Sequence, residues 1–156
     1  MPRKRATAKP DLVHKIKSGW EILKESLAEV ESYNQEYLKF LTQVKTEREA
    51  VEYFRARAGE AGGLELVENR GKALAVCRRG AIPLKDGVRI VVAHIDCPRL
   101  DLKANPLYED TDLAMLKTHY YGGIKKYQWL ARPLALHGVL AKEDGSLVKV
   151  VMGEDP

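Results

Sequence analysis

The chain is best interpreted outward from one stretch, Val91-Val92-Ala93-His94-Ile95-Asp96-Cys97-Pro98. Its first residues complete a predicted strand, residues 88–93, whose last four positions are apolar without a break. A continuous apolar run of this kind is typical of a strand covered on both faces. In an extended backbone, residues two apart point to the same side, so we expect His94 and Asp96 to leave the end of this strand together.

A histidine next to a carboxylate can take part in metal binding. The carboxylate orients the imidazole and raises its basicity, which is what a metal-binding histidine requires from its neighbours. In this interpretation His94 binds zinc through one ring nitrogen, and Asp96 supports it without touching the metal. On spacing alone, however, a structural or surface histidine is the simpler interpretation, because His-x-Asp triplets occur in many proteins.

The region before this stretch has the periodicity of helices. From residue 11 to about residue 45, apolar residues recur every three or four positions, which predicts two amphipathic helices. Ser32 or Asn34 is predicted to cap the second of them, since short polar side chains accept hydrogen bonds from the free N–H groups at a helix start.

A third helix and two strands are predicted to follow. Thr46 and Glu49 fit the capping-box pattern, which places a helix over residues 47–60. Residues 64–68 and 73–78 then form two β-rich runs that a short polar segment with a glycine separates, which indicates a hairpin.

Beyond Pro98 the character of the sequence changes, because strands follow one another with no helical period between them. The predicted strands are 100–104, 113–120, 133–140 and 147–152. We therefore predict an α/β fold class with three parts. They are a basic flexible tail (1–10), the N-terminal part of an α/β domain (11–98) and the start of a β-rich domain (99–156). This arrangement closes no familiar single domain, so we expect an incomplete fold with further sequence downstream.

Composition excludes several classes of protein. The 156 residues are 31% charged, and no apolar run approaches the thickness of a bilayer. The N-terminus lacks the apolar segment of a secretory signal, and Cys77 and Cys97 are too few for a disulfide framework, so we expect a cytoplasmic protein with no membrane partner. The net charge of +4 arises largely from four basic residues among the first ten, without an aromatic residue, which argues against a nucleic-acid partner.

Across Ala93 to Gly138 the sequence resembles the aspartyl-aminopeptidase and vacuolar-aminopeptidase family of two-zinc metallo-aminopeptidases. The resemblance rests on three ordered motifs: His94-Ile95-Asp96-Cys97-Pro98-Arg99-Leu100, Tyr121-Gly122-Gly123, and Trp129 with Arg132-Pro133-Leu134-Ala135-Leu136-His137-Gly138. Three motifs in this order are far more specific than one triplet.

The resemblance implies a function and a place for each part. His94 would be a zinc ligand and Asp96 its catalytic partner, in a site that holds two zinc ions when complete. The other ligands and the general-base glutamate would lie downstream, so that the chain matches only the N-terminal portion, with residues 99–156 beginning an inserted dimerisation domain. Peptides would be the substrates, and a homo-oligomer or a complementing C-terminal portion the partner.

Some alternatives stay open. Ile95 and Cys97 depart from the usual family pattern, and the Cys97 thiolate could compete as a ligand. His119 could reach a substrate or partner subunit, whereas His137 is predicted to be a plain strand residue. Since one imidazole cannot hold zinc tightly, we expect the chain alone to be inactive. The alternative function is a non-catalytic interaction module from a truncated or split gene.

Overall fold

The computed structural model describes residues 16–154. The chain divides into two compact units, with the boundary between Leu41 and Thr42. The predicted tail, residues 1–10, lies outside the described residues, so its conformation stays a prediction. No helix in the described range is long and apolar enough to cross a membrane.

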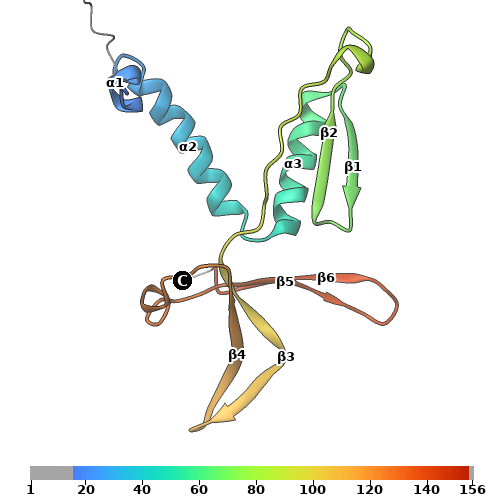
Figure 1. Ribbon diagram of the computed structural model, residues 1–156. Coiled ribbons are helices and arrows are strands. Elements are labelled where there is room, and N and C mark those ends of the chain that lie inside the picture. Colours follow the sequence, from blue (N-terminus) through green and yellow to red (C-terminus); the bar gives the residue numbers. More distant parts are fainter. Residues whose placement is uncertain (1–15, 155–156) are drawn as a thin grey trace, which may run out of the picture. The chain divides into compact units, whose positions relative to one another are not determined.

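The first unit contains helix α1 (Gly19–Leu23) and nearly all of helix α2 (Leu27–Gln43), which confirms two helices in this region (Figure 1). Helix α1 begins with a capping box, in which the Ser18 hydroxyl accepts the Glu21 N–H. The predicted caps of the second helix are wrong, because Ser32 and Asn34 lie inside α2. Helix α2 starts earlier, directly after a turn, and inside a helix such side chains do not act as caps.

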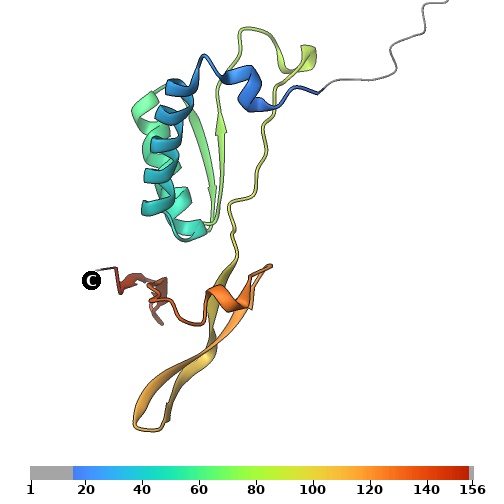
Figure 2. The ribbon, with the colours of Figure 1, turned by 90° about the vertical axis from the view of Figure 1, so that its left-hand side faces the viewer.

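The second unit opens with helix α3 (Glu47–Ala61) and a hairpin of β1 (Glu65–Asn69) and β2 (Ala73–Cys77). The predicted capping box is confirmed, since Thr46 and Glu49 each bond the backbone N–H of the other. Helix α3 lies along this hairpin and contacts β2 (Figures 1 and 2). Among the described residues, the buried apolar side chains are Ala50, Val51 and Ala58, all on α3.

Two further hairpins follow, in the region predicted to be rich in strands. The first joins β3 (Arg99–Asp110) to β4 (Leu113–Tyr121), and the second joins β5 (Leu136–Ala141) to β6 (Leu147–Met152). Each hairpin is a separate two-stranded antiparallel sheet. Short 3₁₀ helices, η1 (Leu84–Asp86) and η2 (Lys126–Gln128), precede β3 and follow β4. The mixed helix and strand class is therefore confirmed.

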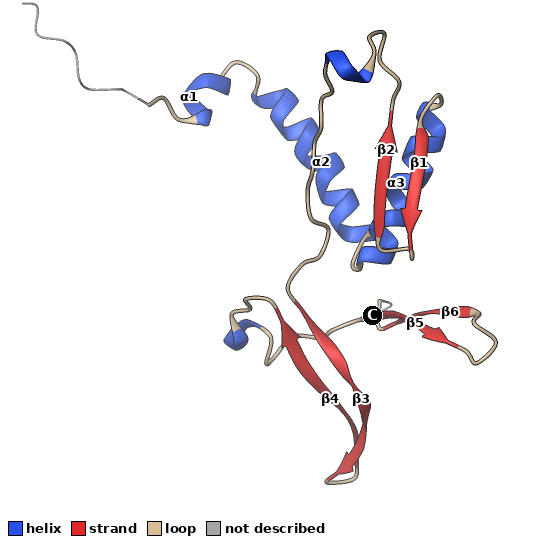
Figure 3. Cartoon of the chain, turned by 45° about the vertical axis from the view of Figure 1, so that its right-hand side comes forward, coloured by secondary structure: helices blue, strands red, loops and turns tan. Residues whose placement is uncertain are grey.

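The strand predicted over residues 88–93 does not form. Figure 3 draws this segment as a loop that runs from η1 toward β3. Its central side chains are exposed, Val91 to 97% and Val92 to 85%. A strand requires a hydrogen-bonded partner strand, and the described residues supply none to this segment. The sequence thus has the apolar pattern of a strand, but residues 16–154 contain no strand that pairs with this segment.

Candidate functional site

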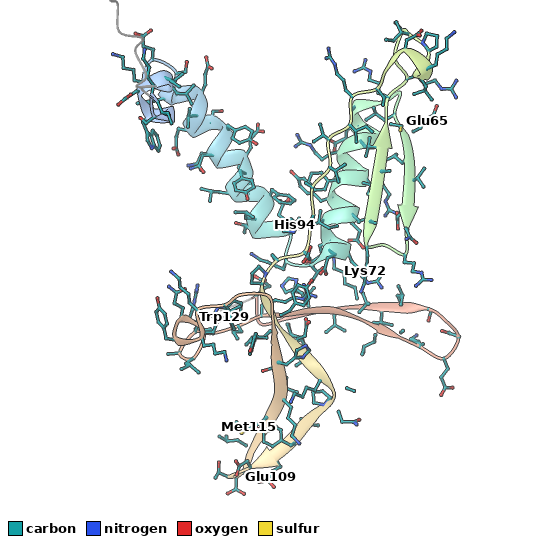
Figure 4. All side chains as sticks on the ribbon, in the orientation of Figure 1. Glu65, Lys72, His94, Glu109, Met115 and Trp129 are labelled. Atoms are coloured by element: carbon teal, nitrogen blue, oxygen red, sulfur yellow. The ribbon has the colours of Figure 1, made fainter. Side chains whose placement is uncertain are left out.

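The segment that precedes β3 carries the predicted pair of functional residues, of which His94 is labelled in Figure 4. The Nδ1 atom of His94 lies 3.1 Å from the carboxylate Oδ1 of Asp96 and 2.9 Å from the backbone oxygen of the same residue. The two side chains are thus brought together as the sequence predicts, although no strand delivers them. The imidazole is exposed rather than packed in hydrocarbon.

These contacts determine the tautomer of His94. Both neighbours of Nδ1 are oxygen atoms that only accept hydrogen bonds, so Nδ1 must carry the proton. In the neutral ring the lone pair then resides on Nε2, which makes no hydrogen bond within the described part of the chain. An imidazole held through Nδ1 by a carboxylate, with Nε2 free, is the usual arrangement of a metal-binding histidine.

A third side chain, which the sequence did not identify, completes this cluster. The Tyr121 hydroxyl at the end of β4 donates a 2.8 Å hydrogen bond to Oδ2 of Asp96. The pKa of Asp96 is lowered, first by this bond from Tyr121 and then by the bond from His94. The same contact raises the pKa of Tyr121, because its phenolate would face a carboxylate. Asp96 is therefore held as an anion between two donors.

Strand register explains how Tyr121 reaches the segment before β3. Arg99 opens β3 and pairs with Tyr121 at the end of β4, so that the chain on either side of this pair lies close together. The next residue, Gly122, has a φ of 70°, and a Cβ there would lie 3.4 Å from Cγ of Pro98. The positive φ favours glycine at position 122. Gly123 has no positive φ, and a Cβ there would meet nothing within 4 Å.

Arg99 connects this cluster to helix α3. Its guanidinium carbon lies 4.3 Å from the centre of the Tyr121 ring, within the range of a cation–π contact. The same guanidinium donates 2.8 Å hydrogen bonds to Glu47 at the start of α3 and to Asp101 on β3. Burial alone would lower the pKa of Arg99, but the two carboxylates raise it overall. The tyrosine ring is therefore covered by a cation that is itself anchored on two sides.

The second cluster in this unit surrounds His137, which the sequence predicts only as a strand residue. Nδ1 of His137 lies 2.9 Å from Oε1 of Glu49, and Nε2 lies 2.6 Å from Oε1 of Glu154. Lys149 Nζ lies 3.9 Å from the same Glu49 oxygen and 3.4 Å from Oε2 of Glu52. Both ring nitrogens are occupied by carboxylates, so this histidine is not arranged to bind a metal.

The remaining predicted positions do not join either cluster. His119 lies on β4, exposed and opposite Asp101 in the strand register. A hollow of about 980 Å³ is lined by residues of α3, β3, β5 and β6, including Arg99 and His137. His94 and Asp96 do not line this hollow.

The chemistry of the donor set decides how far these residues fit a metal. His94 fits as one zinc ligand, because its lone pair is free and its other nitrogen is oriented by Asp96. Across residues 16–154, no group of three or more His, Cys, Asp or Glu side chains is placed to hold an ion. The described residues thus fit one ligand position of a metal site and not a complete site.

Comparison with known proteins defines the class. The family described as "Aminopeptidase I zinc metalloprotease (M18)" matches residues 40–155, which include His94, Asp96 and Tyr121. This chain belongs to the M18 aminopeptidase family, as the resemblance of the three motifs predicted.

Individual relatives make the relationship more specific. The chain is 47% identical over 163 residues to a probable M18 family aminopeptidase 1 of Clostridium acetobutylicum, covering 93% of this chain and 35% of that protein. It is 45% identical over 141 residues to the corresponding protein of Thermotoga maritima, covering 82% of this chain and 31% of the relative. The chain therefore spans about a third of the length of these curated relatives.

Solved structures of M18 aminopeptidases also match this chain over about a third of their length. The crystal structure of the M18 aminopeptidase from Thermotoga maritima superposes with a TM-score of 0.82 at 42% identity, over 92% of this chain and 34% of that one. Aminopeptidase I from Borrelia burgdorferi gives a TM-score of 0.81 at 35% identity, over 90% and 39% of the two chains. The fold described above is thus that of one third of an M18 aminopeptidase.

Proposed function

We propose that this chain supplies one zinc ligand and its orienting carboxylate to the active site of a metallo-aminopeptidase. The single observation that supports this is the contact of His94 Nδ1 with Oδ1 of Asp96, which leaves Nε2 available. His94 would bind the metal through Nε2, and Asp96 would hold the ring and its tautomer. Bound zinc would activate a water molecule and polarise the scissile carbonyl group.

We propose that the rest of the site comes from other polypeptide. A catalytic zinc site uses three protein ligands, whereas residues 16–154 offer no cluster beyond this pair. We propose that the remaining ligands of a two-zinc centre, and the general base, lie in sequence corresponding to the other two thirds of the relatives. Peptides with a free N-terminus would be the substrates. The partner would be a second copy or a complementing C-terminal portion.

A second candidate function is that of a non-catalytic assembly module. The apolar segment 88–93 favours it, because Val91 and Val92 are almost fully exposed and offer an unpaired backbone for association. The two functions differ in one measurable way, since only the first requires His94.

For the compartment, we propose the cytoplasm, because Cys77 and Cys97 are free, exposed thiols that a reducing environment would preserve.

The test joins the chain to the part of a relative that it lacks. In a chimera, residues 1–156 replace the matching first third of the Thermotoga maritima aminopeptidase. Zinc content and release of the N-terminal residue from a peptide are then measured for the chimera and for its His94→Ala variant. We expect the variant to lose zinc and nearly all activity, because a metal site with one ligand removed holds its ion far more weakly.

The matched control is His119→Ala, which removes an imidazole that is also exposed from β4 of the same unit. We expect this variant to keep the zinc content and activity of the chimera. If His94→Ala retains both as well, the chain does not supply a ligand, and the assembly module becomes the better interpretation.

A further inference from the structure

We infer that Tyr121 is a positioning residue, which fixes the carboxylate of Asp96 and through it the tautomer and direction of the His94 ring. The inference rests on the proposed function, in which His94 is the ligand. It assigns to the Tyr-Gly-Gly motif a role beyond that of a turn. The hydroxyl of Tyr121 bonds the carboxylate of Asp96, so its effect on the imidazole passes through that carboxylate.

The two donors on Asp96 use different oxygen atoms. His94 Nδ1 donates to Oδ1, and the Tyr121 hydroxyl donates to Oδ2 at 2.8 Å. The tyrosine therefore does not compete with the histidine for an acceptor. A carboxylate held through one oxygen can still rotate about its side-chain bonds, whereas one held through both has a defined plane. Tyr121 thus directs Oδ1 of Asp96 at Nδ1.

The position of the tyrosine ring is itself determined by neighbours. Arg99 lies over its face at 4.3 Å and is anchored by Glu47 and Asp101. The backbone at Gly122 packs directly against Pro98, two residues after Asp96. An exposed hydrogen bond between mobile side chains would contribute little, because water competes for both partners. Here one partner is restrained by a cation and by the strand register, so less freedom remains to be lost when the bond forms.

A tautomer measurement on the metal-free chain tests this directly. The whole chain is labelled with ¹⁵N-histidine, freed of metal with a chelator, and studied by magic-angle-spinning NMR at a pH of about 8.5, where ordinary histidine is neutral. Sedimented protein serves for this method, so association of the chain does not interfere. The spectrum of His94→Gln assigns the two nitrogen signals of His94.

In the wild-type chain we expect Nδ1 of His94 to resonate as a protonated nitrogen and Nε2 as an unprotonated one. In Tyr121→Phe the two signals should move toward each other, because a carboxylate that is free to rotate leaves the backbone oxygen of Asp96 as the one acceptor that still favours a proton on Nδ1. Tyr120→Phe is the matched control, since it removes a hydroxyl from the neighbouring residue of β4, and its His94 signals should stay at the wild-type positions. Asp96→Ala should shift them at least as far as Tyr121→Phe does.

Wild-type His94 signals in Tyr121→Phe would overturn the inference. So would an equal shift in Tyr120→Phe, because the effect would then reflect the strand and not the hydrogen bond. The Phe variant keeps the ring under Arg99, and a wild-type far-UV circular dichroism spectrum shows that the fold is kept. A shifted tautomer in a chimera that holds no zinc at His94 would contradict the proposed function while supporting the role of Tyr121.

Discussion

His137 on β5 and Glu49 on α3 are 88 positions apart in the sequence, yet Nδ1 and Oε1 of the two residues lie 2.9 Å from each other. Both side chains are about nine-tenths buried. Glu49 also accepts the backbone N–H groups of Lys45 and Thr46 through its other oxygen, so one carboxylate caps a helix and binds a strand. This contact joins the capped helix to the last hairpin.

The contact predicts a pH dependence of stability. Burial alone lowers the pKa of His137, but hydrogen bonds to Glu49 and Glu154 raise it overall from 6.5. Burial alone raises the pKa of Glu49, but the bonds from His137 and Lys45, with the nearby charge of Lys149, lower it overall from 4.5. Glu52 also lies near this cluster, paired with Lys149.

The signs of the two shifts define the pH window. The contribution of His137 is fully present below pH 6.5 and is lost as the pH rises through its raised folded value. The contribution of Glu49 is fully present above pH 4.5 and is lost as the pH falls through its lowered folded value. We therefore expect the free energy of unfolding that depends on this pair to be greatest between pH 4.5 and 6.5.

Substitution of His137 by glutamine tests the prediction. We expect His137→Gln to lower the free energy of unfolding by about 1–3 kcal/mol, because it leaves a buried carboxylate without its charged partner. Urea unfolding followed by circular dichroism from pH 4 to 9 measures the difference from wild type. His119→Gln, at an exposed position, should show no such difference. A loss that is the same at every pH would contradict the ionic character of the contact.

Arg99 and Glu47 predict a coupling between β3 and the start of α3. Their ion pair of 2.8 Å is largely shielded, with side-chain exposures of 28% and 20%. A double-mutant cycle of Arg99→Gln and Glu47→Gln should give a coupling free energy of about 1 kcal/mol by thermal or urea unfolding.

Arg79 and Glu65 offer a control for that cycle. Their ion pair has the same length of 2.8 Å, but the exposures are 89% and 62%. Since water weakens charge interactions at the surface, the corresponding cycle should show no measurable coupling. Equal values for the two cycles would mean that burial does not strengthen the pair of Arg99.

Gly122 and Gly123 form a second matched pair. Alanine at Gly122 must adopt a φ of 70° and place its Cβ 3.4 Å from Pro98, so we expect a loss of roughly 1–2 kcal/mol in the free energy of unfolding. At Gly123 a Cβ meets nothing within 4 Å and φ is not positive, so Gly123→Ala should change stability by less than about 0.5 kcal/mol. Equal losses at both positions would show that the turn has another conformation in solution.

The exposed valines predict self-association of the chain. Analytical ultracentrifugation should reveal association that rises with concentration, and Val91→Asp should raise its dissociation constant about tenfold or more. The reason is that one buried valine side chain contributes about 1.5 kcal/mol. Leu130→Asp is the control, because Leu130 is 85% exposed but lies outside the apolar segment. A chain that stays monomeric at all concentrations would contradict the prediction.

The sequence by itself determined much of the local structure and the contact of His94 with Asp96. The capping box of Thr46 and Glu49 and the hairpin turns depend on residues within a few positions of one another, so their patterns are visible in the chain. His94 and Asp96 are two residues apart, and their contact was predicted for the same reason. The family was identified from three short motifs.

Only the tertiary structure decided which distant residues meet. Tyr121 reaches Asp96 across 25 positions, and His137 reaches Glu49 across 88, through strand register and packing that no short pattern encodes. Segment 88–93 shows the same principle in reverse, because its apolar pattern predicts a strand that the described residues leave unpaired. A strand forms only when a neighbouring strand hydrogen-bonds its backbone N–H and C=O groups. The local apolar pattern therefore predicts a strand, but tertiary contacts determine whether it forms.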